Sequence, residues 1–157
     1  MHLELIAHNL RSAENVGALF RICDSLGIAK LWLTGYTPTP LHRKVAKTAL
    51  GAETSVAWEF VADIVSVLAN LRVAGFRIVA LEIAPNATSL IEYAPFQKTA
   101  LLLGNEVTGI QPSLLALCDD SVAISQQGKK ESLNVAIAAG IAAFWMMNRG
   151  VDSRLTE

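Results

Sequence analysis

Three polar segments of this 157-residue chain combine side chains that can bind and orient a ligand. Ser132 and Asn134 stand just before a long run without charge. Residues 104–109, Gly-Asn-Glu-Val-Thr-Gly, follow a run of leucines, and residues 9–17 are followed by Arg21. Hydroxyl, amide, carboxylate and guanidinium groups supply the donors and acceptors of a polar site. Each segment lies where a strand ends or a helix begins, which is where open α/β folds bind ligands. We therefore expect one site built from all three.

The elements that must position these segments follow from the hydrophobic periodicity. Strands are expected at residues 3–7, 30–34, 56–60, 77–81, 99–103 and 121–124, and helices at 14–26, 42–49, 61–73, 112–117 and 133–148. Strand 99–103 is the most continuously apolar, so we expect it to be central and covered on both faces. The alternation predicts a single α/β domain over residues 1–157, with a mostly parallel sheet flanked by helices.

The composition indicates a self-associating protein with no overall pull towards nucleic acid. The chain is 52% hydrophobic with a mean hydropathy of +0.40, so part of its apolar surface is expected in a subunit interface. The net charge is −1, so any nucleic-acid contact must come from a local patch. The uncharged stretch 132–148 is too short and too polar at its ends to span a bilayer. The start of the chain has no signal-peptide pattern, and we expect a cytoplasmic protein.

The cysteines and histidines form no recognisable cofactor pattern. Cys23 and Cys118 have no motif spacing, and we expect two reduced, buried side chains rather than a disulfide. His2, His8 and His42 make no metal-ligand pattern with a cysteine or a carboxylate, so we expect no metal.

The glycine-bounded segment 104–109 is not a standard phosphate loop. No Gly-x-Gly-x-x-Gly follows the first strand, and the segment lacks the lysine of a P-loop. Its Glu106 would repel a phosphate, so a ligand held here is expected to be neutral or cationic. For this segment alone, the alternative is a simple turn with a solvated glutamate.

The other polar residues also have plain structural alternatives. Arg21 is expected near the face of Asn15, about two helical turns along, but it can equally be an exposed arginine paired with Asp24 or Glu14. Ser132 or Asn134 can cap the last helix and still contact a ligand.

Two groups of basic residues lie beside the polar segments. Arg43, Lys44 and Lys47 follow His42, and Lys129 precedes Lys130. Such groups are usually solvated faces, although their position beside polar loops fits contacts with an RNA backbone.

Taken together, the segments resemble the three motifs of the SpoU/TrmH-type branch of the SPOUT RNA methyltransferases. Residues 15–21, Asn-Val-Gly-Ala-Leu-Phe-Arg, resemble the first motif, and residues 103–110 the second. Residues 121–124 followed by 131–136 resemble the third. The resemblance covers almost the whole chain, with the motifs in the family's order, and we expect no N- or C-terminal RNA-binding extension.

The resemblance implies a fold and a cofactor. The C-terminal part would thread through a loop into a deep trefoil knot, an exception among protein folds. Two chains would form a homodimer with sites near the interface. The cofactor would be S-adenosyl-L-methionine, bent into the knot and held largely by backbone groups. The implied cofactor contacts are Leu81, Gly104, Ile124, Ser132 and Leu133. Gly104 is expected to matter because a side chain there would crowd the cofactor.

The implied reaction is methylation of a ribose 2′-hydroxyl of RNA. The implied catalytic residues are Arg21, Asn15, Glu106, Ser132 and Asn134. RNA contacts are expected at Arg11, Arg43, Lys44, Lys47 and Lys129. The family assigns proton handling to Arg21, but an arginine can instead orient a phosphate and stabilise a developing alkoxide. The expected substrate is tRNA, with rRNA as the runner-up. The rival hypotheses are a non-catalytic knotted dimer that binds RNA or the cofactor, and a Rossmann-type nucleotide enzyme, disfavoured by the missing glycine fingerprint.

Overall fold

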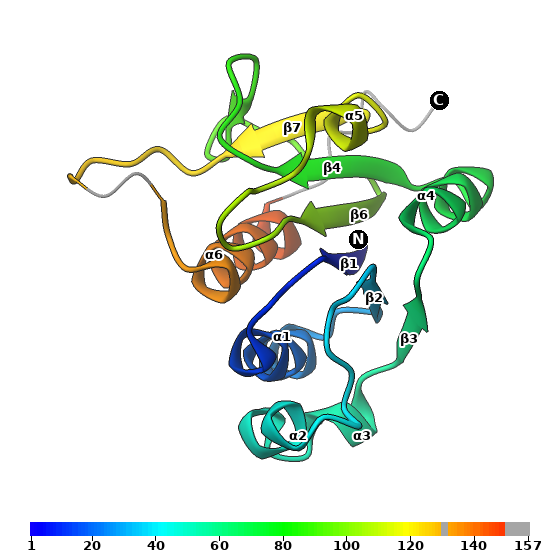
Figure 1. Cartoon of the computed structure of the whole chain (residues 1–157). Helices are drawn as coiled ribbons and strands as arrows, with labels where there is room; N and C mark the ends of the chain where they lie inside the picture. The colour runs from blue at the N-terminus through cyan, green and yellow to red at the C-terminus, as the bar shows by residue number, and fades with distance from the viewer. Residues whose placement is uncertain (130–131, 150–157) are drawn as a thin grey trace.

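The computed structural model describes residues 1–129 and 132–149 (Figure 1). Its strands are β1 His2–His8, β2 Lys30–Thr34, β3 Trp58–Val61, β4 Arg77–Leu81, β5 Thr88–Ser89, β6 Lys98–Leu103 and β7 Asp120–Ala123. Its helices are α1 Ala13–Leu26, α2 Arg43–Ala49, α3 Ala52–Ser55, α4 Ile64–Val73, α5 Pro112–Leu115 and α6 Val135–Asn148. The element order confirms the α/β class expected from periodicity.

The strands form one sheet in the order β3-β2-β1-β6-β4-β7-β5. Every paired strand runs parallel to its neighbour. Strand β6 is central, with Leu101 opposite Leu5 of β1 and Val79 of β4, as its apolar sequence predicts. Because all strands point the same way, the loops after β1, β4, β6 and β7 gather at one edge of the sheet.

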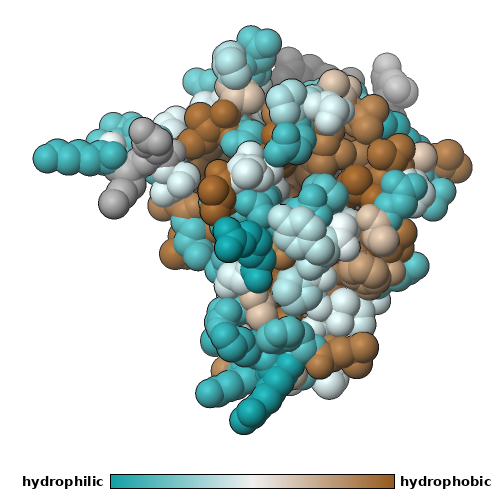
Figure 2. Space-filling view, in the orientation of Figure 1, coloured by the Kyte–Doolittle hydropathy of each residue, from teal (hydrophilic) through white to brown (hydrophobic). Residues whose placement is uncertain are grey.

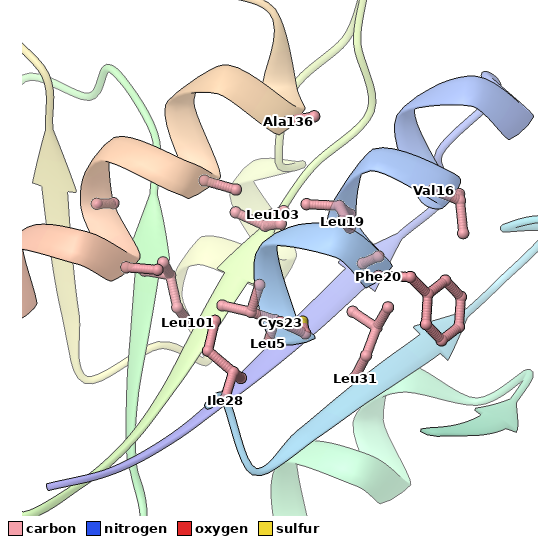
Figure 3. Close-up of a cluster of buried hydrophobic side chains, with 14 of the residues drawn as sticks. Leu5, Val16, Leu19, Phe20, Cys23, Ile28, Leu31, Leu101, Leu103 and Ala136 are labelled. Carbon is pink, nitrogen blue, oxygen red and sulfur yellow. The ribbon is translucent and has the colours of Figure 1, made fainter. Parts of the chain in front are cut away.

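Alternate residues of the strands build two cores on opposite faces of the sheet. Leu101 and Leu103 point towards α1 and α6, as Figure 3 shows. Ala100 and Leu102 point the other way, into a second cluster with α4. Side chains of a strand alternate between faces, so a central strand covered on both sides must be apolar throughout. This explains the unbroken hydrophobic run of β6.

Helix α1 is capped at both ends by residues that favour a helix boundary. The Ser12 side chain caps its first turn by accepting from the backbone N–H of Asn15, and Gly27 ends it in the left-handed conformation. Helix α2 packs against α1 rather than on the sheet. A Cβ at Gly17 would lie 2.6 Å from Cβ of Thr48, so glycine permits this close approach. The contact fixes the basic helix α2 beside α1.

Several expected boundaries were wrong by a few residues. Strand β3 covers 58–61 instead of 56–60, and α4 begins at Ile64 instead of residue 61, because the Asp63 side chain caps it. The last helix begins at Val135, two residues later than predicted. The expectation missed α3 and β5, which have only four and two residues. Strand β5 forms through its pairing with β7, which the local sequence does not encode.

Helix α6 is apolar on every side but buries only part of its surface. The buried residues are Ala136, Ala139, Ala142, Ala143 and Met146. Ile137, Ile141 and Phe144 are exposed and recur at helical spacing, so they form one apolar stripe. Among the described helices, none is both long and apolar enough to cross a membrane.

Both cysteines are free thiols, as expected. Cys23 lies in the core between α1 and the sheet, and burial raises its pKa to about 12. Cys118 is half-buried beside α5, and burial raises its pKa to about 11. Neither thiol carries the lowered pKa of a reactive cysteine.

Candidate functional site

A pocket of about 300 Å³ opens at the carboxyl edge of the sheet. Its walls come from the ends of β4, β6 and β7, from the loop 104–109, and from the start of α6. The five residues predicted as cofactor contacts all line it: Leu81, Gly104, Ile124, Ser132 and Leu133. The structure thus brings together residues from three segments far apart in the sequence.

Glu106 faces the start of α1. Its Oε2 accepts from the backbone N–H of Arg11 at 2.9 Å, and its Oε1 accepts from that of Ser12 at 2.9 Å. The Asn15 side chain donates a third bond, from Nδ2 to Oε1 at 3.0 Å. A carboxylate at a helix N-terminus also interacts favourably with the helix dipole. The alternative of a solvated glutamate in a simple turn is therefore wrong.

Asn134 extends this network to the third motif. Its Nδ2 donates to Oδ1 of Asn15 at 3.0 Å, while its own Oδ1 accepts from the backbone N–H groups of Ala136 and Ile137. Asn134, rather than Ser132, is therefore the cap of α6, and the cap is also a site residue. Glu106, Asn15 and Asn134 form one continuous chain of hydrogen bonds across the three motifs.

The environment of Glu106 favours its ionised form. Partial burial alone would raise its pKa, but hydrogen bonds from the backbone N–H groups of Arg11 and Ser12 and from Asn15 outweigh it. The pKa of Glu106 therefore lies below its ordinary value of 4.5. The carboxylate is charged at neutral pH and is committed to ordering the loop 9–12.

Replacing Glu106 by glutamine should destabilise the protein. One carboxylate oxygen would become an NH₂ group facing N–H donors, leaving at least one donor without an acceptor. The expected loss in the free energy of unfolding is about 1–2 kcal/mol. Urea denaturation of Glu106→Gln beside wild type measures it. Thr108→Ala, an exposed change in the same loop, is the control. Equal stability of wild type and Glu106→Gln would contradict the assigned hydrogen bonds.

The same variant gives a pH test. In the unfolded chain Glu106 takes up its proton near pH 4.5, whereas in the folded chain it does so at a lower pH. Its stabilising contribution is therefore complete above about pH 4.5 and is lost as the pH falls through the folded pKa. The stability gap between wild type and Glu106→Gln should shrink over that range. A gap that widens on acidification would contradict the lowered pKa.

The pocket contains a second carboxylate that the sequence reasoning missed. Glu82 follows β4 directly, and its Oε2 accepts from the backbone N–H of Ile110 at 2.8 Å. This bond joins the loop after β4 to the loop after β6. The available signal was a carboxylate placed immediately after a buried strand.

Gly104 is constrained by its own loop. A Cβ there would lie 2.5 Å from the carbonyl carbon of Gly109 and 2.6 Å from a side-chain carbon of Ile110. The sequence predicted that a side chain at position 104 would crowd the cofactor. In the structure, such a side chain would first collide with Gly109 and Ile110 of the protein itself. Gly104 allows the loop to close and thereby shapes the pocket wall.

Arg21 lies apart from the pocket, exposed on α1. Six residues turn a helix by about 600°, so its side chain diverges from that of Asn15 by roughly 120°. The expectation that the two share a face is therefore wrong. The proposed ion pairs are also not seen: Glu14 contacts Lys44 at 3.5 Å, and Asp24 accepts from Ser55. Within residues 1–129 and 132–149, the side chain of Arg21 makes no hydrogen bond or ion pair.

The five predicted RNA-binding residues are exposed but lie at three separate places. Arg43, Lys44 and Lys47 lie on α2, and Figure 2 shows hydrophilic side chains gathered at this end of the molecule. Arg11 precedes α1, next to Glu106. Lys129 stands in the loop after β7, away from α2. Its neighbours 130 and 131 lie outside the described residues.

The residues that line the pocket fit an amphipathic, positively charged ligand. Leu81, Leu103 and Ile124 supply apolar walls for a flat ring, and Glu82 and Glu106 supply negative charge. The chemistry of these residues therefore fits S-adenosylmethionine, whose adenine is apolar on its faces and whose sulfonium is cationic.

Comparisons with known proteins agree with this geometry. The model of the SpoU rRNA Methylase family matches residues 2–144. The chain is 28% identical over 145 residues to a tRNA (guanosine(18)-2′-O)-methyltransferase of Aquifex aeolicus, covering 90% of this chain and 67% of that protein. The chain spans between about half and two thirds of the curated relatives it matches.

Solved structures share the fold as well. An AdoMet-bound rRNA methyltransferase from Sinorhizobium meliloti superposes with a TM-score of 0.87 at 25% identity, covering 92% of this chain and 55% of that one. A structure described for the 2-OH methylation of C/U34 on tRNA gives a TM-score of 0.83 at 27% identity and covers 92% and 93% of the two chains.

Proposed function

Because this chain belongs to the SpoU rRNA Methylase family, we propose that it transfers a methyl group from S-adenosylmethionine to a ribose 2′-hydroxyl of RNA. The main observation behind the proposal is that the pocket and the hydrogen-bonded polar residues lie next to each other at one edge of the sheet. The pocket lined by the five expected cofactor contacts adjoins the hydrogen-bonded chain of Glu106, Asn15 and Asn134.

Leu81, Ile124 and Leu133 would hold the cofactor by apolar contact, with the backbone of the loop 104–109 as the opposite wall. When bound, the cofactor supplies a methyl group already activated by its sulfonium. The protein must therefore mainly align this donor with the hydroxyl and help to remove a proton. We also propose that the segment carrying these walls is knotted as in the family.

Different polar residues would position the RNA and stabilise the reacting hydroxyl. Asn15 is fixed by Glu106 and Asn134, so the start of α1 has a set position relative to the pocket. Ser132 lines the pocket and is exposed, which leaves its hydroxyl available to the ribose. Arg21 would bind the RNA phosphate and stabilise the developing alkoxide, roles suited to a permanently charged guanidinium.

Transfer RNA is the proposed substrate, supported by the names of the curated relatives. Ribosomal RNA is the second candidate, supported by the name of the S. meliloti protein. The test is incubation of the purified chain with labelled S-adenosylmethionine and either bulk tRNA or rRNA, followed by nucleoside mapping. Label in a 2′-O-methylnucleoside is expected. Cofactor binding without transfer to any RNA would favour a non-catalytic binding protein instead.

We propose in addition that the chain is a homodimer whose interface includes the apolar stripe of α6. Light scattering should give twice the 16.8 kDa mass of one chain. Phe144 is 58% exposed in the stripe, so Phe144→Glu would bury a charge at the interface and should give monomers. Val73→Glu changes a 91% exposed residue of α4 and should leave the dimer intact. A folded, active wild-type monomer would refute the dimer.

A further inference from the structure

Tyr36, in the loop after β2, has an exposed ring whose position is fixed from two sides. Its side chain is 61% exposed, yet its hydroxyl accepts a hydrogen bond from Nδ2 of the buried Asn105 at 3.0 Å. Its backbone N–H donates to Oδ1 of Asn9 at 3.2 Å. An isolated exposed aromatic residue is ordinary, but one anchored at both backbone and hydroxyl is pre-organised.

The anchors of Tyr36 are themselves held in place. Asn9 adopts a left-handed conformation with φ of 55°, and its Nδ2 donates to Nε2 of His8 at 3.0 Å. Because Nε2 of His8 accepts this bond, the proton of the neutral ring lies on Nδ1, which contacts Oγ1 of Thr34 at 2.9 Å. Burial lowers the pKa of His8, which keeps it neutral at physiological pH. The network therefore fixes the ring of Tyr36 before any ligand arrives.

This fixed ring lies beside the proposed catalytic residues. Asn105, which bonds the Tyr36 hydroxyl, directly precedes Glu106 and lines the pocket. Asn105 also donates to the backbone carbonyl of Asn9, two residues before Arg11. From Tyr36 the chain continues into the basic helix α2. Tyr36 is thus linked through Asn9 to the segment that carries Arg11, and it precedes the helix that carries Arg43, Lys44 and Lys47.

We propose that Tyr36 is a stacking platform for a nucleobase of the RNA substrate, an inference that rests on the function proposed above. Single-stranded nucleic acids are recognised by combining basic residues along the backbone with aromatic rings under the bases. Here Arg11 and α2 supply the charges, and Tyr36 supplies the ring. Stacking would place a nucleotide next to the loop that carries Glu106.

The competing explanation is that Tyr36 only closes the loop through its hydroxyl. Tyr36→Phe separates the two roles, because it keeps the ring and removes the bond from Asn105. Tyr36→Ala removes both. Phe60→Ala, which deletes a 43% exposed ring on the edge strand β3, is the matched control.

The experiment measures the affinity of the full chain for unfractionated tRNA, and for rRNA fragments, over a series of salt concentrations without cofactor. Tyr36→Ala should weaken binding by roughly five- to a hundredfold, and Tyr36→Phe and Phe60→Ala should bind like wild type. The dependence of affinity on salt should stay unchanged in Tyr36→Ala, whereas Lys44→Ala should lower its slope by about one. Calorimetry should give the same cofactor affinity for all the Tyr36 variants.

Three results would overturn the platform. They are wild-type affinity in Tyr36→Ala, an equal loss in Tyr36→Phe, and a loss of cofactor affinity in Tyr36→Ala that reveals a collapsed loop. Failure of the proposed function looks different, because wild type would then bind RNA and cofactor without methyl transfer. The RNA affinities of the Tyr36 variants test the stacking role whether or not the protein transfers a methyl group.

Discussion

Arg21→Ala is expected to lower methyl transfer by about a hundredfold or more while leaving S-adenosylmethionine affinity nearly unchanged. The reason is geometric: Arg21 is exposed on α1 and does not line the pocket, so it can act on the RNA but not on the cofactor. Arg21→Lys should also be badly impaired, because lysine keeps the charge but loses the planar fork that can hold a phosphate and a hydroxyl together. Single-turnover assays with saturating cofactor, together with calorimetry, measure both effects.

The control for this prediction is another exposed arginine. Arg72 on α4 lies on the opposite face of the sheet and pairs with Asp119 at 3.2 Å, so Arg72→Ala should keep full turnover. If Arg21 were only a surface residue, its replacement would cost at most roughly 1 kcal/mol in stability and little activity. Near-normal methylation by Arg21→Ala would establish that reading and remove Arg21 from the mechanism.

Gly104→Val is expected to abolish cofactor binding and to lower stability by about 1–3 kcal/mol. A side chain at this position meets the backbone of Gly109, which cannot move aside as a flexible side chain would. The loop 104–109 would have to open, and the wall of the pocket would move with it. Calorimetry with S-adenosylmethionine and thermal unfolding of the same preparation measure the two losses.

Gly128→Ala provides the matched control, because nothing lies within 4 Å of a Cβ at that position. It should bind cofactor and unfold like wild type. Gly104→Ala should show an intermediate loss, since it adds the colliding atom without the rest of valine. Wild-type cofactor affinity in Gly104→Val would contradict the placement of the cofactor against this loop.

The local patterns of the sequence determined the elements that carry the site. The unbroken apolar run of β6 predicted a central strand, and the hydrophobic spacing of residues 14–26 predicted α1. These features depend on neighbouring residues and on the sheet's two-residue period, so they are readable without a tertiary structure. The motif resemblance likewise named five residues that are all among those lining the pocket.

Only the tertiary structure decided what those residues do to one another. Glu106 was ambiguous in the sequence because its partners Arg11 and Ser12 lie 95 and 94 residues away. The contacts of Glu82 and Tyr36 could not be predicted, since they are made with Ile110 and Asn105, in a loop distant in the sequence. From the residue types and the hydrophobic spacing, the sequence predicts which chemical groups lie at the end of each strand. Which groups meet across the sheet edge is fixed by the order and register of the strands, and those are set by packing between distant segments.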